Sequence, residues 1–244
     1  MTKVKHSKAQ QNINWLKKIP IAHRGLHDKT HAVFENSLSA VKAAVDGGYS
    51  IEVDLQPSSD QIPMVFHDAD LKRMTTRDDK IRDVNQLTLN KINLLSSDDT
   101  IPTLQQLFDL VDGRSGLVLE MKGHEGPVEG FVPAILDAIS KYDGPVVIMS
   151  FDHWLLEEAR DLAPDFPIGL TAYGDDNRYE INRQAAEDYG VDFVSYELAN
   201  LDCKFVSEFK KTGKPVISWT VRTRKDLERS NKYADQPTFE GFRP

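Results

Sequence analysis

The sequence predicts an α/β fold, namely a closed (β/α)8 TIM barrel with a small insertion after the third strand. Three observations lead to this prediction. The chain has 244 residues, a length at which α/β barrels often form one domain. Eight apolar, strand-like runs recur along it, and most are separated by segments with helical periodicity. Alternating strands and helices predict a parallel sheet, and eight of them suggest a closed barrel; a doubly wound open sheet is the alternative.

The predicted strands are short apolar runs, several of which end at polar or charged residues. In chain order they are Pro20 to His23, Ser50 to Leu55, Ile62 to His67, Gly116 to Lys122, Pro145 to Phe151, Pro167 to Tyr173, Asp192 to Glu197 and Pro215 to Val221. The first helix follows Asn36 and Ser37, either of which can cap it, and ends at Gly47-Gly48. The other helices are Thr103 to Asp112, Val128 to Lys141, His153 to Leu162, Arg178 to Tyr189, Lys204 to Lys211 and Thr223 to Ser230.

Two connections depart from this regular alternation. The link from Leu55 to Ile62 is too short for a crossover helix, but an extended return of about eight residues spans roughly 26 Å. The segment from Ala69 to Thr100 is long, polar and rich in charge, which is typical of a functional loop or a small subdomain. We therefore expect one barrel domain over residues 1–244, with an insertion over about residues 69–100.

Composition and charge limit the classes of function. The net charge is −8, which disfavours binding to nucleic acid, because the phosphate backbone attracts Lys and Arg. The single cysteine, Cys203, cannot form an intramolecular disulfide. The start, MTKVKHSKAQQNINWLKK, is polar and basic and lacks the apolar segment of a secretory signal, and no transmembrane span is predicted. We expect a cytoplasmic location and no stable membrane anchor.

Three carboxylates belong to strands that are otherwise apolar. Glu52 and Asp54 are two residues apart in one strand and therefore share a face, and Glu120 shares a face with Lys122 in a later strand. Carboxylates are rarely buried unless they are paired or hold a metal. Together in a barrel mouth they form an oxygen-rich site for a hard cation such as Mg²⁺ or Ca²⁺. Separately, each faces solvent or pairs with Lys or Arg.

Two of the seven histidines, His23 and His67, end apolar runs and are followed by a charged residue. Strand C-termini form the active face of a barrel, where two imidazoles can act as general base and general acid. Taken singly, such a histidine is more often structural. Arg24 and Lys122 fit a phosphoryl group beside a metal ion, or salt bridges to the carboxylates. Trp219 offers an apolar wall for substrate carbons, or is a core or rim aromatic.

Several short motifs resemble, in order and spacing, the glycerophosphodiester phosphodiesterase family. The motifs are HRG (23–25), FENS (34–37), EVD (52–54), PMVFHD (63–68), LEMK (119–122) and SWTV (218–221). The stretch IPTLQQLFDLV (101–111) resembles the segment by which that family returns from its insertion to the barrel. The resemblance covers nearly the whole chain from Pro20, and the ordered set of HRG, ExD, HD and ExK is highly specific.

The resemblance implies a (β/α)8 barrel with its insertion after the third strand. It implies that Glu52, Asp54 and Glu120 bind one divalent metal ion, for which Mg²⁺ and Ca²⁺ are the candidates. It also implies that Arg24 and Lys122 hold the phosphate of a small-molecule glycerophosphodiester.

The resemblance further implies that His23 and His67 are the acid/base pair of a metal-dependent hydrolysis that yields glycerol 3-phosphate and an alcohol. We take His23 as the base and His67 as the acid, with the reverse order open. The nucleophile is either water or the neighbouring glycerol hydroxyl, and attack by the hydroxyl gives a cyclic phosphate that water then opens. Neither the alcohol headgroup nor the oligomeric state follows from these residues.

The chain departs from the family pattern in three places. Ser37 stands where the family often has Thr, and Arg222 stands where it often has Asn after WTV. The usual ending, an apolar strand leading to Thr-Asp-x-Pro, is replaced by YADQPTFEGFRP. These departures bear on substrate preference and on how the barrel closes, and they leave the metal site intact.

Two other functions fit parts of the same pattern. A lysophospholipid substrate requires an apolar rim, and the insertion offers a local apolar face of Leu87, Leu89, Ile92, Leu94 and Leu95. A barrel that binds a phosphorylated ligand without turnover does not require both His23 and His67. Since both histidines are present, the hydrolase is the preferred reading.

Overall fold

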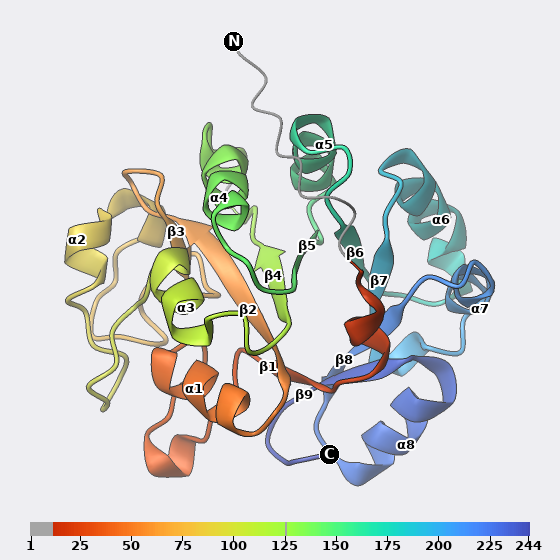
Figure 1. The fold of residues 1–244 in the computed structure, drawn as a ribbon, viewed down its shortest axis with the longest axis horizontal. Coiled ribbons are helices and arrows are strands. Elements are labelled where there is room, and N and C mark those ends of the chain that lie inside the picture. The colour runs from red at the N-terminus through yellow and green to blue at the C-terminus, as the bar shows by residue number, and fades with distance from the viewer. Residues whose placement is uncertain (1–11, 125) are drawn as a thin grey trace.

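Eight parallel strands form a closed ring with helices around it (Figure 1), so the predicted (β/α)8 fold class is confirmed. The structure is a computed structural model that describes residues 12–124 and 126–244. In order around the ring, the strands are β1 (Ile21–His23), β2 (Ser50–Pro57), β4 (Leu117–Met121), β5 (Val146–Ser150), β6 (Ile168–Ala172), β7 (Phe193–Glu197), β8 (Val216–Val221) and β9 (Gln236–Phe239). Most of the polar start considered above falls on residues 1–11, which lie outside the described residues.

Two strands differ from the prediction. The run from Ile62 to His67 was expected as a ring strand, but β3 (Pro63–Val65) pairs antiparallel with β2 outside the ring. The short link between them permits a hairpin, in which the Ser58 amide donates to the Ile62 carbonyl at 3.1 Å. The ring is completed instead by β9, which pairs in parallel with both β8 and β1. The sequence pattern missed β9 because that strand is short and contains Pro237.

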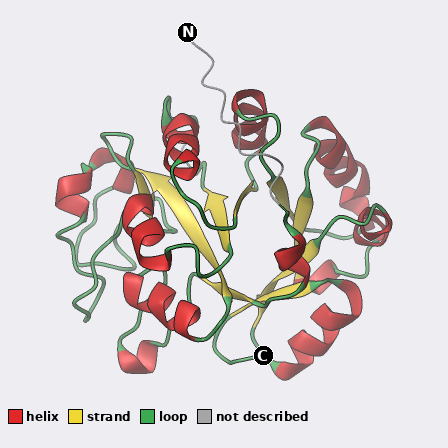
Figure 2. Cartoon of the chain, viewed as in Figure 1, coloured by secondary structure: helices red, strands yellow, loops and turns green. Residues whose placement is uncertain are grey.

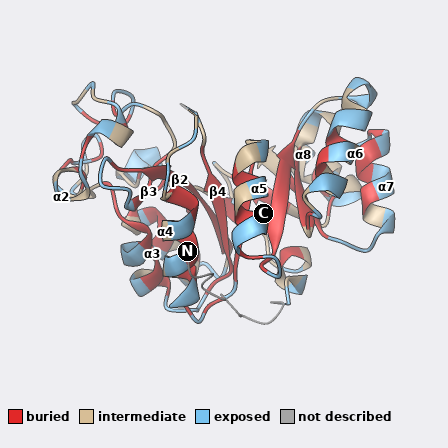
Figure 3. Ribbon diagram, turned by 90° about the horizontal axis from the view of Figure 1, so that it is seen from above, coloured by how far each residue is buried: buried red, intermediate tan, exposed pale blue. Residues whose placement is uncertain are grey.

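The helices cover the outside of the ring in chain order, as Figure 2 shows. They are α1 (Leu38–Asp46), α3 (Leu104–Val111), α4 (Phe131–Ser140), α5 (His153–Leu162), α6 (Tyr179–Asp188), α7 (Lys204–Lys211) and α8 (Arg224–Tyr233). Three of them begin at a hydroxyl side chain, of Ser37, Thr103 or Thr223, that accepts a hydrogen bond from a backbone amide of the first turn. Figure 3 shows the buried strands between helices whose outer faces are exposed.

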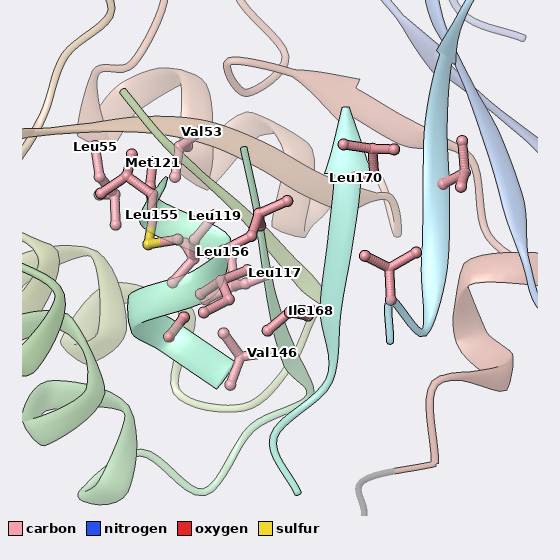
Figure 4. Packing of buried hydrophobic residues seen from close by; sticks show 14 of the residues in the cluster. Val53, Leu55, Leu117, Leu119, Met121, Val146, Leu155, Leu156, Ile168 and Leu170 are labelled. Carbon is pink, nitrogen blue, oxygen red and sulfur yellow. The ribbon is translucent and has the colours of Figure 1, made fainter. Parts of the chain in front are cut away.

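The main core fills the layer between the strands and the helices. Figure 4 shows Leu155 and Leu156 of α5 beside Leu117, Leu119 and Val146 of β4 and β5, all of them fully buried. Burying such side chains stabilises the fold by roughly 1.5–3 kcal/mol each. This layer therefore holds the strands, and with them the side chains that face the inside of the ring, in fixed positions.

A second core lies inside the ring at the N-terminal ends of the strands. Its buried members are Leu16, Ile21, Val118, Val147, Met149, Phe193 and Ile217. Leu16 comes from a short 3-10 helix, η1 (Asn14–Lys17). Along the strands the inward positions alternate, so the residue two positions after Ile21 is His23, and two after Val118 is Glu120. The inside of the ring is therefore apolar at one end and polar at the C-terminal end of the strands.

The segment after β3 has its own small core. It contains a 3-10 helix, η3 (Ile81–Asp83), and a single helical turn, α2 (Gln86–Leu89). Its buried apolar cluster includes Leu71, Ile81 and Leu89, together with Met64 and Phe66 from β3 and the residue following it. Among the described residues, no helix has both the length and the apolar character needed to cross a membrane.

Candidate active site

The candidate site lies where β1, β2 and β4 run side by side. The parallel register places His23 of β1 opposite Glu52 of β2. Two residues further along β2, Asp54 lies opposite Glu120 of β4. Neighbouring strands in a sheet are about 4.8 Å apart. The register therefore gathers four predicted site residues at the C-terminal end of the ring.

The HRG motif forms a sharp turn that requires glycine at position 25. Arg24 and Gly25 have φ values of 54° and 78°, in the left-handed region. A Cβ atom on Gly25 would lie 2.7 Å from the carbonyl carbon of Ala40, so a larger residue does not fit there. The Arg24 amide donates to Glu52 Oε2 at 3.0 Å, and its carbonyl accepts from the Asn36 amide at 2.9 Å. The turn thereby directs Arg24 back toward the strands.

Glu52, Asp54 and Glu120 form a buried acidic cluster. One carboxylate oxygen from each lies within 4.8 Å of the others. Glu52 Oε1 is buried and has no hydrogen-bond partner among the described residues. Burying a carboxylate oxygen without a partner destabilises the fold unless another group binds that oxygen. Three carboxylate oxygens at this spacing are the donors that a hard divalent cation prefers, so the residues fit the metal ion that the family implies.

The three carboxylates of this cluster and the two cations beside them change one another's ionisation. Burial raises the pKa of Glu52 well above its usual range, and the nearby Asp54 and Glu120 raise it further. Burial also raises the pKa of Glu120. For Asp54 burial acts in the same direction, but the charges of Lys122 and Arg24 outweigh it and lower the pKa. A divalent cation would remove the repulsion that opposes full ionisation of the three acids.

The two predicted phosphate-binding cations are both paired with acids. Arg24 Nη1 donates to Glu35 Oε1 at 2.6 Å, and Arg24 Nε lies 3.2 Å from Asp54 Oδ2. Lys122 Nζ lies 3.0 Å from Asp54 Oδ1 and also contacts the carboxylate of Glu120. Asn36 Nδ2 donates to Asp54 Oδ2 at 2.9 Å. The salt bridges that were the alternative reading of these cations are therefore present, and they hold both cations beside the acidic cluster.

His67 reaches the same region although β3 lies outside the ring. Its Nδ1 lies 2.6 Å from Asp68 Oδ1, and Asp68 is in turn bound by Arg73 Nε at 2.5 Å. His124 Nε2 donates to the His67 carbonyl at 3.1 Å, and the two rings lie edge to face. Burial lowers the pKa of His67, while the nearby charge of Asp54 opposes that shift.

His23 is held by a residue from the far end of the chain. Its Nδ1 lies 2.5 Å from Glu240 Oε2, and its Nε2 lies 3.9 Å from Glu52 Oε2. Arg222 Nε donates to Glu240 Oε1 at 2.7 Å. Burial lowers the pKa of His23, and the hydrogen bond to Glu240 acts in the opposite direction. His27 Nε2 is also near this carboxylate, at 3.8 Å from Glu240 Oε2.

A sequence profile of the glycerophosphoryl diester phosphodiesterase family matches residues 23–237, which is most of the chain and includes most of these residues. The chain belongs to this family. A curated relative, a glycerophosphodiester phosphodiesterase of Caldanaerobacter subterraneus subsp. tengcongensis, is 29% identical over 234 residues, covering 89% of this chain and 91% of that protein.

Solved structures in this family have the same fold. A phosphodiesterase from Oleispira antarctica, solved in complex with the product sn-glycerol-3-phosphate, is 25% identical with a TM-score of 0.78, covering 91% of this chain and 93% of that one. A glycerophosphodiester phosphodiesterase from Thermotoga maritima is 24% identical with a TM-score of 0.74, covering 91% of this chain and 93% of that one. The resemblance noted from the motifs is thereby confirmed at the level of family and fold.

In this member of the family, Trp219 of β8 is part of an aromatic wall beside the site. It is half-buried, and its Nε1 donates to the Ser195 carbonyl at 3.2 Å. Its ring meets Phe151 edge to face at 5.3 Å between centroids, and Phe151 lies 6.3 Å from Tyr173. Lys122 Nζ lies 5.8 Å from the centroid of Phe151. The wall therefore runs from the charged cluster toward the outer edge of the site.

Some residues of the site were not predicted from the sequence. Glu35 and Asn36 lie in the FENS motif, but Asn36 was considered only as a helix cap, a role that Ser37 has in the structure. Arg73 lies in the charged insertion, where no pattern distinguishes it from its neighbours. His27 lies in a loop, where no pattern marks it as a site residue. For Glu240 the only available signal was the unusual ending of the chain relative to the glycerophosphodiester phosphodiesterase family.

Proposed function

We propose that this chain hydrolyses small-molecule glycerophosphodiesters to glycerol 3-phosphate and an alcohol, with one divalent metal ion, Mg²⁺ or Ca²⁺. The observation that carries the proposal is the buried acidic cluster of Glu52, Asp54 and Glu120 with Arg24 and Lys122 against it. The names of the relatives and the product in the Oleispira structure support this substrate class.

In this proposal, the three carboxylates hold the metal ion, which when bound supplies positive charge to polarise a phosphoryl oxygen. Arg24 and Lys122 hold the phosphate. Both cations already lie beside Asp54, so the substrate phosphate arrives in a preformed network and needs little rearrangement. Guanidinium and ammonium groups in a buried site act on a phosphoryl group more strongly than in water.

His23 and His67 carry the proton transfers. We assign His23 as the base that takes the proton of the nucleophile at Nε2, and His67 as the acid that protonates the leaving alcohol oxygen. Each histidine has a carboxylate on Nδ1, Glu240 for one and Asp68 for the other, so Nε2 is the nitrogen left for the substrate. The reverse assignment, and water or glycerol hydroxyl as nucleophile, are the alternatives within this proposal.

The rest of the proposal concerns the surroundings of the site. Trp219, with Phe151 beside it, provides an apolar wall for the glycerol or alcohol carbons. We further propose one barrel domain over residues 1–244, with an insertion over about residues 69–100. A cytoplasmic location without a stable membrane anchor belongs to the same proposal, as does the lack of a nucleic-acid partner.

The apolar residues of the insertion favour this substrate over a lysophospholipid. Leu89, Ile92 and Leu94 are buried in the cluster of the insertion itself. Of the five residues considered for an apolar rim, four leucines and one isoleucine, only Leu87 and Leu95 are exposed. Two exposed apolar side chains are common on any protein surface, and the other three residues of the expected apolar face are buried.

The test is release of glycerol 3-phosphate from glycerophosphocholine by the purified protein with Mg²⁺, Ca²⁺, Mn²⁺ or EDTA. We expect release that disappears with EDTA and returns with one of the ions. If no ion supports release of glycerol 3-phosphate, the proposed reaction is contradicted. If the protein instead hydrolyses a lysophospholipid, the substrate class is a lysophospholipid and not a small glycerophosphodiester.

The unfolding temperature tests the metal site independently of turnover. The ion that supports activity should raise the unfolding temperature of the unaltered protein, because binding to the folded state stabilises it. The rise should be smaller in Glu120→Gln. It should be unchanged in Glu187→Gln, a matched variant at an exposed ion pair with Arg183 on α6. An equal rise in all three proteins would exclude the cluster as the metal site.

A further inference from the structure

Glu240 is a partly buried carboxylate placed where the ring closes. It follows β9 directly, and its amide donates to the Val221 carbonyl of β8 at 3.0 Å. Its side chain is 19% exposed. Each of its oxygens has a separate partner: Oε1 accepts from Arg222 Nε at 2.7 Å, and Oε2 lies 2.5 Å from His23 Nδ1. Backbone and side chain both hold this carboxylate in place.

The contact with His23 determines which ring nitrogen carries the proton. An ionised carboxylate only accepts hydrogen bonds, so His23 Nδ1 must be the donor. In a neutral imidazole the lone pair is then on Nε2. Nε2 is also the nitrogen on the side of the acidic cluster, 3.9 Å from Glu52 Oε2. Glu240 thus fixes the orientation of the ring and its tautomer together.

We propose that Glu240 is a positioning residue that holds His23 with its proton on Nδ1 and its Nε2 toward the substrate, and that Arg222 holds Glu240 in turn. This inference rests on the proposed function, in which His23 transfers a proton. Glu240 acts through His23: its Oε1 accepts from Arg222 and its Oε2 from His23 Nδ1, with His27 Nε2 3.8 Å from the same Oε2.

The proton balance of the step is simple. When the nucleophile attacks, its O–H bond breaks and an Nε2–H bond forms on His23, while the proton on Nδ1 stays hydrogen-bonded to Glu240. His23 becomes an imidazolium whose positive charge faces the carboxylate. A carboxylate in this place supports either direction of transfer, because it stabilises the charged imidazolium without exchanging a proton with it.

Arg222 contributes less than Glu240 to the orientation of His23. Its side chain is 59% exposed, and ion pairs with an exposed partner are weak. Its amide donates to Asp226 Oδ2 at 3.2 Å, so the backbone at this position has another anchor. We therefore expect a graded effect, in which loss of Glu240 matters more than loss of Arg222.

The kinetic test compares Glu240→Gln, Glu240→Asp and Arg222→Met with the unaltered protein at saturating Mg²⁺ or whichever ion supports activity. Glutamine keeps the size but removes the charge, and its amide can also donate to Nδ1 and so favour the other tautomer. We expect kcat to fall by about ten- to hundredfold in Glu240→Gln with KM within about threefold. Glu240→Asp keeps the charge and should recover part of kcat, and Arg222→Met should lose less than Glu240→Gln.

The matched control is Glu208→Gln on α7. Glu208 also accepts a short hydrogen bond from an aromatic side chain, the Tyr179 hydroxyl at 2.5 Å, but lies on an outer helix. It should keep kcat and KM unchanged. A kcat within about threefold of the unaltered protein in Glu240→Gln, or a rise in KM alone, would overturn the proposal.

The tautomer itself gives a readout that needs no substitution at Glu240. In protein with ¹⁵N-labelled histidine and Mg²⁺ or Ca²⁺ present, NMR of the ring nitrogens should show His23 protonated on Nδ1, with the signal assigned by its loss in His23→Asn. A proton on Nε2 of the neutral ring would overturn the proposal even if Glu240→Gln failed to fold. If the unaltered protein hydrolyses no glycerophosphodiester, the proposed function fails, while the tautomer still decides the role of Glu240.

Discussion

Five charged side chains lie against one another at the C-terminal end of the ring. Glu52, Asp54 and Glu120 carry three negative charges when ionised, and Arg24 and Lys122 carry two positive ones. The set is therefore one charge negative. A divalent ion makes it one charge positive, and a phosphodiester with a single negative charge brings it to zero. In the proposed function, the charge of these five groups would balance the combined charge of the metal ion and the substrate.

At the same scale, His67→Ala should lower kcat by about 10²- to 10⁴-fold, the usual contribution of a general acid or base. Metal binding should be mostly unaffected, because the acidic cluster is formed by other residues. The measurement is glycerol 3-phosphate release at saturating metal, together with the metal-induced rise in unfolding temperature.

His31→Ala is the matched control for this variant. His31 forms the same kind of pair, with its Nδ1 2.7 Å from Asp28 Oδ2, but its side chain is 77% exposed. Its turnover should stay normal. Near-normal turnover in His67→Ala would show that His67 takes no part in proton transfer, regardless of the result for metal binding.

Between elements, the insertion is fastened to the barrel by a network of ion pairs. Arg73 of the insertion contacts Glu35 with Nη2 at 2.7 Å, and Glu35 also accepts from Arg24. Arg73 reaches Asp68 as well, beside His67. One arginine of the insertion is therefore linked to both a cation and a histidine of the site, and the position of the insertion bears on the site geometry.

The pH dependence of stability should report this network. Burial alone would raise the pKa of Glu35, but the hydrogen bond from Arg73 and the charge of Arg24 lower it from 4.5 to about 2. A carboxyl whose pKa is lower in the folded state stabilises the fold above its unfolded pKa, and this stabilisation is lost as the pH falls from 4.5 toward 2. At neutral pH it amounts to up to about 3 kcal/mol.

Urea unfolding of Glu35→Gln between pH 7 and pH 3 measures this contribution. The unaltered protein should be more stable than the variant at pH 7, and the difference should shrink below about pH 4.5. Glu187→Gln, at an exposed ion pair, should differ by less than about 1 kcal/mol at each pH. A difference between Glu35→Gln and the unaltered protein that stayed constant down to pH 3 would speak against ionisation of Glu35 as its cause.

Among the elements, those with a strong periodic pattern were predictable and those fixed by distant pairing were not. The alternation in β2 placed Glu52 and Asp54 on one face, and the structure has both side chains buried together. The antiparallel course of β3 depends on a hairpin that the strand's own apolar pattern does not distinguish from a parallel return. The strand β9 is recognisable only through its partners β8 and β1.

The residues of the site also divide into those that a local sequence pattern predicts and those that depend on a distant contact. His23, Arg24 and Lys122 could be selected because each stands at the end of an apolar run. Glu240 could not, because its meaning depends on a contact with His23 across 217 positions of sequence. Contacts of such separation leave no local periodicity, so only the closed ring reveals them.

For the whole molecule, the ring is weakest where its first and last strands meet. Two residue pairs join β1 to β9, whereas five join β2 to β4. Local opening of a protein is easiest where few contacts hold it. Native-state hydrogen exchange should therefore show faster exchange for ladder amides between β1 and β9 than for those between β2 and β4. Equal protection in both pairs would mean that the ring opens only with global unfolding.

The pair formed by His23 and Glu240 spans this junction. A chain in which β9 has not yet reached β1, whether still being synthesised or partly opened, can have its acidic residues in place but lacks the partner that orients His23. Such a chain would hold a metal ion and a substrate without an aligned base. By this reasoning, full turnover requires that these two distant parts of the polypeptide have joined, because only then is the proposed base aligned.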